Sequence, residues 1–267
     1  DFCPLNNSES LLAKGKINQT FGDVYNLIKK SDISILNLEA PLTNNKKAIL
    51  KCGPNLKLNP LIAKSIKKVG FSIANLANNH IRDFGTEGID DTVKVLKNNK
   101  IKFFGIRENL KANPKPLYTT QKGSRVAMLG FAENEFSIID EDRWGAEPIS
   151  PAENCEMIRQ TSAKADITLV FVHGGNEYCP FPSPPMIKLY RAYARNGASA
   201  VIGSHPHVPQ GYEIYNGVPI FYSLGNFLFP FPFQRQLPTK LWYQGTTVKL
   251  GFKAGKISKI QFHPIQV

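Results

Sequence analysis

Side chains able to bind metal recur in this sequence directly after short apolar runs, where the carboxyl ends of strands are expected. They are Glu39, Asn78, Asn79, His80, His173, His205 and His207. Because the carboxyl ends of parallel strands meet at one edge of a sheet, these side chains are expected to converge there. Carboxylate oxygen, amide oxygen and imidazole nitrogen together suit Zn, Mn or Fe, and their number is sufficient for two ions that share a carboxylate.

Each of these residues also has a simpler structural interpretation. A lone histidine is usually a hydrogen-bonded structural residue, and an asparagine pair is compatible with a turn because asparagine tolerates left-handed geometry. The H-x-H spacing at a strand end, with two further strand-end sites, favours metal binding by His173, His205 and His207. The nearby His80 favours the same interpretation for Asn79.

The elements needed to position these residues alternate along the chain from its start to about residue 205. Apolar runs and amphipathic helices follow one another, which is the pattern of a layered α/β domain. Strands are expected at 32–38, 71–77, 101–104, 167–172 and 200–202, and helices at about 60–70, 85–99, 150–164 and 184–197. A length of 267 residues is within the range of one such domain, so a single domain over residues 1–267 is expected.

Local signals mark the ends of several elements. Ser150 begins the pattern of a capping box, and Leu61 is expected on the buried side of its helix. Toward the end of the chain the pattern changes to hairpins, with turns at 216–217 and 254–255. The segment 227–233 (FLFPFPF) contains two prolines, so it is expected to be neither helix nor central strand and to cover the core.

The chain is basic, with 33 Lys and Arg against 21 Asp and Glu and a formal charge of +12. This balance favours anionic partners, including an anionic small molecule, a polymer such as polyglutamate, nucleic acid or the surface of a membrane. Many lysines fall on predicted helices, namely Lys64, Lys67, Lys68, Lys94 and Lys97. Aromatic residues are not interleaved with them as a base-stacking groove requires, so solvated helix faces are expected and nucleic acid is disfavoured.

The compartment is left open by the sequence. No stretch approaches the roughly 20 apolar residues that a membrane-spanning helix needs, and the first residues lack the charged-then-apolar pattern of a leader. A removed leader would lie upstream of the sequence, so export is not excluded. The cysteines at 3, 52, 155 and 179 form no C-x-x-C pair, and their even number is compatible with two disulfides or with four free thiols. The oligomeric state is not indicated.

Five segments resemble fingerprints of the bacterial capsule synthesis (poly-gamma-glutamate synthesis, CapA-like) family. They are NLEAPLT (37–43), ANNHIRDFGTEGI (77–89), HGGNEY (173–178), GSHPHV (203–208) and PIFYSLGNFLF (219–229). Five matches in the right order over most of the chain are far more specific than any one of them. The resemblance implies a calcineurin-like metallophosphoesterase fold, that is, a layered α/β β-sandwich flanked by helices, with a dinuclear centre in at least some members. It also implies a location outside the cytoplasm or at the cell envelope.

The resemblance also assigns roles to individual residues. The implied ligands are Asp1, Glu39, Asn79, His173, His205 and His207, with Glu39 bridging, His173 and His205 on one ion and His207 on the other. His80 matches the histidine that would protonate a leaving oxygen. Most phosphoesterases of this fold have aspartate at the position of Glu39, although the CapA-like group has glutamate.

Two departures from the pattern lie at the start of the chain. The fold usually has histidine two residues after the opening aspartate, and here that position is Cys3, which implies that one ion is held more weakly. An apolar strand is expected before Asp1 and is not in the sequence, so the natural chain is expected to begin upstream.

Other candidates come from their positions in the sequence. Asp83 is close enough to His80 to orient it. Arg107 lies just past a predicted strand and could clamp a phosphate or carboxylate, and a solvent-exposed loop arginine explains it equally well. Glu177 and Tyr178 fit a hydrogen-bonding layer around the ligands and are expected to contact substrate, and a surface turn is the alternative. Asn226, in the segment SLGNF, is expected to cap a turn beneath the site.

The chemistry of the predicted site favours hydrolysis of a phosphoester, with divalent ions activating water and His80 as the general acid. The alternative is a non-hydrolytic accessory protein that holds poly-gamma-glutamate or another anionic polymer during its assembly or export. A nuclease is a third and weaker hypothesis, because charge alone suggests it.

Overall fold

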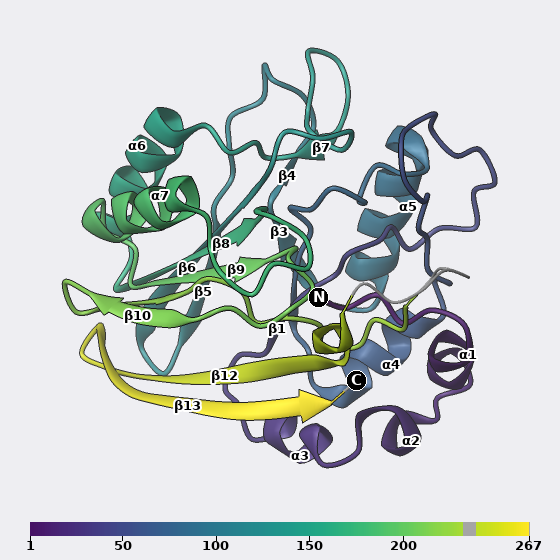
Figure 1. Cartoon of the computed structure of the whole chain (residues 1–267). Helices are drawn as coiled ribbons and strands as arrows, with labels where there is room; N and C mark the ends of the chain where they lie inside the picture. The colour runs from purple at the N-terminus through teal and green to yellow at the C-terminus, as the bar shows by residue number, and fades with distance from the viewer. Residues whose placement is uncertain (232–238, 267) are drawn as a thin grey trace.

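The computed structural model describes residues 1–231 and 239–266 and contains two principal sheets (Figure 1). The first has three parallel strands in the order β1, β2, β3: Ile35–Asn37, Ile73–Asn75 and Lys102–Phe104. The second has six strands in the order β10, β11, β9, β8, β6, β5: Tyr212–Tyr215, Val218–Phe221, Ala200–Ser204, Ile167–His173, Ser124–Ala132 and Leu117–Gln121. Each predicted strand coincides with a strand in the structure.

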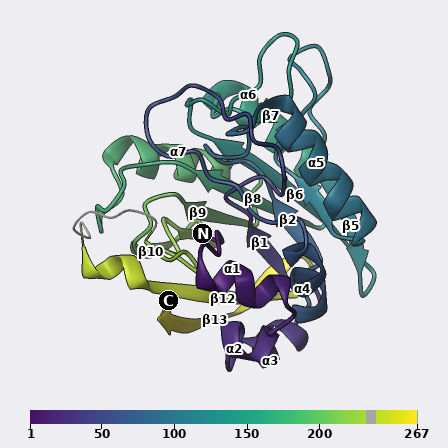
Figure 2. The same ribbon diagram turned by 90° about the vertical axis from the view of Figure 1, so that its right-hand side faces the viewer.

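Helices cover the outer faces of the two sheets (Figures 1 and 2). Those on the side of the first sheet are α1 (Asn7–Ala13), α2 (Ile17–Phe21), α3 (Val24–Lys29), α4 (Ile62–Val69) and α5 (Gly85–Asn98). Those on the second sheet are α6 (Pro151–Ser162) and α7 (Pro184–Arg195). The layers therefore run helix, sheet, sheet, helix, which is the layered sandwich expected from the sequence.

Apolar side chains fill each interface between these layers. One buried cluster lies between the first sheet and its helices, and a second lies between the six-stranded sheet and α6 and α7. A third joins the two sheets, and in it the rings of Phe104 and Phe171 lie 5.2 Å apart. The sheets are thus packed face to face by side chains from β3 and β8.

The described residues include three hairpins with two-residue turns. The predicted turns at 216–217 and 254–255 join β10 to β11 and β12 (Gln244–Lys253) to β13 (Lys256–Gln266), and both residues of each turn have positive φ. Lys122 and Gly123 form a third turn of this kind between β5 and β6, which the sequence interpretation did not include. Short elements lie at β4 (Ile106–Arg107), β7 (Gly145–Ala146) and the 3₁₀-helix η1 (Lys240–Tyr243).

Two local predictions were wrong. The Ser150 side chain makes no capping hydrogen bond; instead its backbone N–H donates to Asn154 Oδ1 over 2.8 Å, so a side chain within the helix satisfies it. Leu61 is 55% exposed, because α4 begins at Ile62 and Leu61 lies just before it, outside the buried apolar side of the helix. The lysines on α4 and α5 are exposed as predicted.

The phenylalanine-rich segment covers core where it is described. Phe229 is buried, and the rings of Phe229 and Phe231 pack against Trp242. The end of that predicted segment, residues 232–233, lies outside the described residues. The four cysteines are free thiols, and no described helix is long and apolar enough to cross a bilayer.

Candidate metal centre

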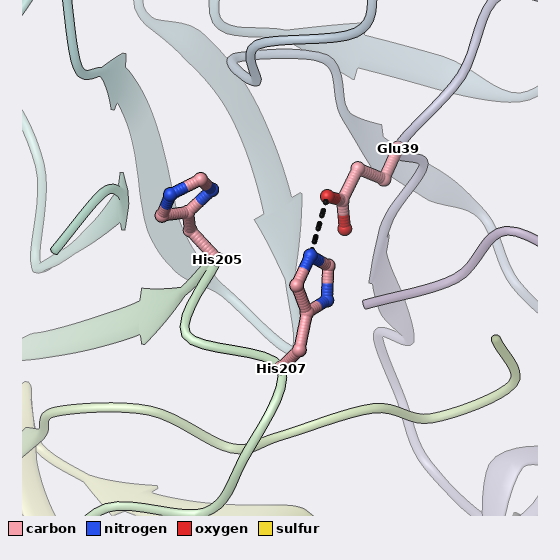
Figure 3. Close-up of side chains that lie close together, drawn as sticks. All are labelled: Glu39, His205 and His207. Carbon is pink, nitrogen blue, oxygen red and sulfur yellow. Dashed lines mark ion pairs between the residues drawn. The ribbon is translucent and has the colours of Figure 1, made fainter. Parts of the chain in front are cut away.

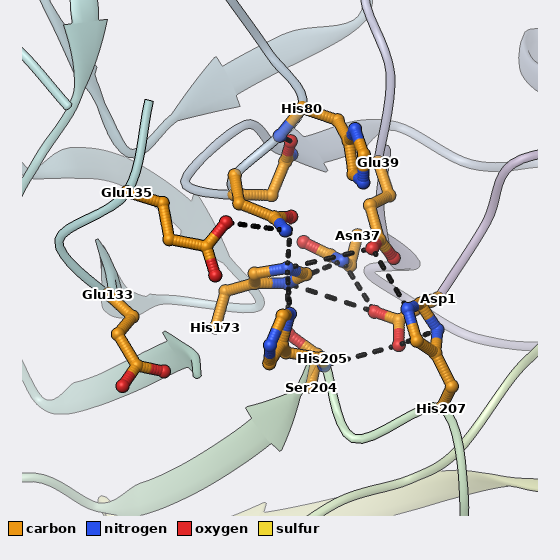
Figure 4. A network of polar contacts seen from close by, with 12 residues as sticks. Asp1, Asn37, Glu39, His80, Glu133, Glu135, His173, Ser204, His205 and His207 are labelled. Atoms are coloured by element: carbon orange, nitrogen blue, oxygen red, sulfur yellow. Dashed lines mark hydrogen bonds and ion pairs between the residues drawn. The ribbon is translucent and has the colours of Figure 1, made fainter. Parts of the chain in front are cut away.

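The structure brings the six residues predicted as metal ligands into one buried cluster (Figure 4). Five of them are labelled in Figure 4, namely Asp1, Glu39, His173, His205 and His207; the sixth is Asn79, whose Oδ1 lies 3.0 Å from His173 Nε2. Their placement corrects the expectation of a single sheet edge, because Glu39 and Asn79 follow strands of the first sheet whereas the histidines end or follow β8 and β9 of the second. The parallel strands of both sheets point their carboxyl ends at the same place.

Asp1 is held beside these strand ends by its neighbour in the chain. Phe2 forms parallel bridges with Leu38 and with Leu228, and the Asp1 carboxylate accepts a hydrogen bond from Asn37 Nδ2 over 2.8 Å. The backbone N–H of His205 donates to the other carboxylate oxygen over 3.2 Å. Asp1 is therefore fixed between the two sheets.

Glu39 lies at the centre of the cluster and is completely buried. Within the described residues, neither of its carboxylate oxygens has a hydrogen-bond partner. Oε1 lies 3.6 Å from Nε2 of His207 (Figure 3) and 3.6 Å from Nε2 of His173, and both distances are too long for hydrogen bonds. A buried carboxylate without donors is costly unless it is paired or coordinates a metal, so this group fits a cation.

Both ring nitrogens of His173 have polar neighbours in the cluster. Nδ1 lies 3.0 Å from Ser204 Oγ, and the Ser204 hydroxyl donates to the carbonyl of Val172 over 3.3 Å. In the tautomer in which Nδ1 donates to Ser204 Oγ, the lone pair is on Nε2 and is available to a metal; Asn37 Nδ2, 3.3 Å from Nδ1, would donate to the other tautomer. The Nε2 atom lies 3.0 Å from Asn79 Oδ1 and 3.2 Å from Nδ1 of His205.

The Asn79 amide is oriented from its other side. Its Nδ2 donates to Glu135 Oε2 over 3.0 Å, so Oδ1 faces His173. Two acceptors, Asn79 Oδ1 and His173 Nε2, consequently face each other near an unpartnered carboxylate. A divalent cation would satisfy all three at once.

His207 is oriented in the same way. Its Nδ1 donates to Asn226 Oδ1 over 3.0 Å, and Asn226 Nδ2 donates to the carbonyl of Trp242 over 3.0 Å. This pair of bonds fixes the imidazole tautomer and leaves Nε2 facing Glu39, an arrangement typical of metal-binding histidine. The sequence suggested that Asn226 caps a turn; in the structure its side chain also orients the His207 imidazole.

The potential ligand atoms form two groups. Glu39 with His205 and His207 make one, Asp1 with Glu39 and His173 make the other, and within each group the atoms lie within 4.8 Å of one another. Glu39 belongs to both, as expected for a bridging acid. His205 differs from the sequence assignment, because it groups with His207 and also contacts His173. In the described part of the chain neither group includes Cys3.

His80 lies at the edge of the cluster, beside Asp83. The distance from His80 Nδ1 to Asp83 Oδ2 is 2.7 Å, and Asp83 is completely buried. Burial lowers the pKa of His80, and the hydrogen bond to Asp83 opposes this change. The pairing that sequence proximity suggested is thus a hydrogen bond in the structure.

The three residues predicted to bind substrate have different surroundings. The Tyr178 ring stacks on His207 with centroids 6.4 Å apart, while Glu177 is exposed and its charge opposes the lowering of the pKa of His205. Arg107 donates to Glu147 over 3.0 Å and to the carbonyl of Ala112 over 2.9 Å. A substrate clamp by Arg107 stays a prediction.

Several residues around the ligands were missed by the sequence interpretation. They include Asn37, Glu133, Glu135, Ser204 and Trp242. The signal for two of them was present, because the apolar run of β6 ends just before Glu133 and Glu135 in the same way as the other strands end before ligands. The others are recognisable only once distant segments are in contact.

Burial changes the protonation of the cluster. It raises the pKa of Glu39 to about 8, with additions from the carboxylates of Glu177 and Glu135, and it lowers the pKa of both His205 and His207 to about 4. At neutral pH His205 and His207 of the metal-free protein are therefore neutral, and Glu39 carries a proton.

Metal binding is consequently expected to release the Glu39 proton. Because protons compete with metal, the affinity for Zn should rise by up to about tenfold per pH unit toward pH 8 and level off above it. Competition with a chromophoric chelator between about pH 6 and pH 9 measures this dependence. An affinity that does not change over this range would show that Glu39 is already ionised in the metal-free protein.

The layered sandwich is the calcineurin-like metallophosphoesterase fold, and the cluster gives this fold a site suited to metal. A hypothetical protein from Thermus thermophilus has the same fold, with a TM-score of 0.57 and 15% identity over 97% of this chain and 94% of its own. A novel phosphatase from Mycoplasma pneumoniae gives a TM-score of 0.56 and 15% identity over 96% and 89%. At this identity the likeness shows the fold alone.

Within this class, the chain belongs to the bacterial capsule synthesis protein family, PGA_cap, whose family model matches residues 2–230. It is 35% identical over 218 residues to the capsule biosynthesis protein CapA of Bacillus anthracis, covering 78% of this chain and 53% of that protein. The PGA biosynthesis protein CapA of Bacillus subtilis (strain 168) is 34% identical over 209 residues, covering 76% and 54%.

More distant relatives belong to other bacteria. A probable polyglutamine synthesis accessory protein of Mycobacterium tuberculosis is 26% identical over 209 residues, covering 73% of this chain and 55% of that protein. The chain thus spans about half the length of these curated relatives.

Proposed function

We propose that this chain is a metal-dependent phosphoesterase that acts at the cell envelope in the assembly of capsule or another anionic polymer. The observation that carries the proposal is the buried carboxylate of Glu39, which has no donor among the described residues and is faced by the Nε2 atoms of His173 and His207. Relatives named for capsule and polyglutamate synthesis support the polymer context.

Two divalent ions, of Mn, Zn or Fe, are the cofactor proposed for the cluster. Asp1, Glu39 and His173 would hold one ion, and Glu39, His205 and His207 the other, with Glu39 shared and Asn79 Oδ1 beside His173. Bound there, the ions would supply Lewis acidity toward a phosphoryl oxygen and an activated water. The chain itself supplies the fixed ligand orientations, through Ser204, Asn226 and Glu135.

His80 is the proposed general acid. Its Nδ1 proton is held by Asp83, so Nε2 is the atom that would give a proton to the leaving oxygen. The low pKa that burial produces makes the imidazolium a stronger acid. Glu177 and Tyr178 would line the substrate's approach, because Tyr178 lies on the His207 ring.

The accessory function is retained as the second candidate because a relative is named for it. In that case the same positively charged centre would hold the carboxylate end of a polymer such as poly-gamma-glutamate without breaking a bond. The formal charge of +12 favours either anionic ligand.

Metal analysis and a phosphatase screen distinguish the two functions. Protein purified without chelator is expected to contain close to two ions per chain and to hydrolyse an aryl phosphate when supplied with Mn or Zn. Chelation should remove turnover, and the metal alone should restore it. Metal-loaded protein that binds poly-gamma-glutamate but turns over no phosphoester would reject the enzyme and favour the accessory function.

A further inference from the structure

Lys51 places a buried side chain beside the proposed general acid, and neither the sequence motifs nor the predicted ligand set includes this residue. Its Nζ donates a hydrogen bond to Asp83 Oδ1 and lies 3.2 Å from His80 Nδ1. The Lys51 side chain is 3% exposed and that of Asp83 is completely buried. The lysine is therefore withdrawn from solvent at the back of the His80 imidazole.

We propose that Lys51 is a positioning residue for His80 and acts through Asp83. The inference rests on the proposed phosphoesterase function, in which His80 gives a proton to the leaving oxygen. Lys51 makes no contact with the reacting atoms in this scheme; its role is to fix the carboxylate that fixes the imidazole.

The Asp83 carboxylate accepts hydrogen bonds at both of its oxygens. Oδ1 accepts from Lys51, while Oδ2 accepts from the backbone N–H of Leu56 over 2.7 Å and from His80 Nδ1 over 2.7 Å. Each oxygen has its own donors, so the plane of the carboxylate is determined from both ends. Without Lys51, Oδ1 would be a buried anionic oxygen without a donor, and the carboxylate would be free to rotate away from His80.

Lys51 belongs to a segment that is hydrogen-bonded to the backbone of Asp83. The backbone N–H of Ile49 donates to the Asp83 carbonyl over 2.9 Å, and the Asn55 side chain donates to the Ile49 carbonyl over 3.1 Å. The ammonium also lies 6.0 Å from the centre of the Phe136 ring. These contacts order the long side chain before substrate binds, as a positioning residue requires.

A purely structural ion pair would have the same contacts, so the test must report on proton donation. Loss of a general acid slows the departure of a poor leaving group more than that of a good one. The comparison is therefore between phenyl phosphate, whose leaving group is poor, and p-nitrophenyl phosphate, whose leaving group is good.

Lys51→Met is expected to lower kcat for phenyl phosphate by about tenfold or more and kcat for p-nitrophenyl phosphate by only about threefold. Lys51→Arg, which keeps the charge and the donors, should recover part of the loss. In a His80→Ala background, Lys51→Met should have no further effect, because the residue that it positions is absent. Lys57→Met is the matched control, since Lys57 lies in the same segment and donates to the carbonyl of Asn45 instead.

Equal losses for the two substrates, or a full additional loss in the His80→Ala background, would overturn the proposal. If Lys51→Met does not fold, the same substrate comparison with Lys51→Arg decides it, because a changed donor geometry should still affect phenyl phosphate more. Thermal melts identify that case.

A spectroscopic readout separates this proposal from the proposed function. In the metal-free protein, ¹⁵N NMR should show His80 protonated on Nδ1, and Lys51→Met or Lys51→Arg should change that signal while Lys57→Met leaves it unchanged. If the wild type hydrolyses neither phosphate, the phosphoesterase function fails and the His80 signal alone decides the role of Lys51. An unchanged His80 signal in both Lys51 variants would reject it.

Discussion

His205→Ala is expected to lose metal and, with it, phosphoesterase turnover. Its imidazole is one of the few ligands available, with Nδ1 lying 3.2 Å from Nε2 of His173 and a place in the group formed with Glu39 and His207. A ligand imidazole contributes binding energy directly, so its removal should reduce metal content toward one ion or none per chain and turnover to background. Elemental analysis and aryl phosphate hydrolysis on the same sample measure both.

The matched control for this variant is His263→Ala. His263 lies in β13, paired with Thr247, and is the histidine outside the cluster. It should keep both metal and turnover. If His205→Ala retained a full metal complement, His205 would not be a ligand, and the group that contains it would have to be reassigned.

His80→Ala is expected to separate the two properties, with metal retained and turnover lowered by about 10² to 10⁴-fold. The reason is that His80 is hydrogen-bonded to Asp83 and belongs to neither of the two ligand groups. It can therefore give a proton without holding an ion. Metal content and kcat, measured on one preparation, report the two effects independently.

Two results would require a different assignment. An emptied site in His80→Ala would make His80 a ligand and would change the roles given to Asn78, Asn79 and His80. Unchanged turnover in both His80→Ala and His205→Ala would place the activity at another site or in a contaminant, and polymer binding would become the leading function.

The strand ends were the most informative part of the sequence. Apolar runs at 32–38 and 167–172 predicted β1 and β8, and the polar residues just after them proved to lie in contact across the cluster. This worked because both the strand and its end are local features of the sequence. The family fingerprints predicted the sandwich fold, whereas the composition alone did not.

What could not be predicted depends on contacts between distant segments. The sequence does not say which strands share a sheet, so a single edge was expected where two sheets meet. Lys51 carries no motif, and its importance appears only when its segment lies against Asp83. Arg107 is a similar case, because the position after a strand did not reveal its partner Glu147.

The C-terminal part of the chain has a consequence for where this protein can be divided. The Trp242 carbonyl orients Asn226, its indole ring lies 4.6 Å from the His207 ring, and its N–H donates to the Phe229 carbonyl over 2.7 Å. The family model ends at residue 230, before Trp242. A fragment that ends at residue 230 would keep every histidine of the cluster but would lose Trp242, which supports His207 through Asn226. The shortest segment able to maintain this centre is therefore longer than the segment that the family model matches.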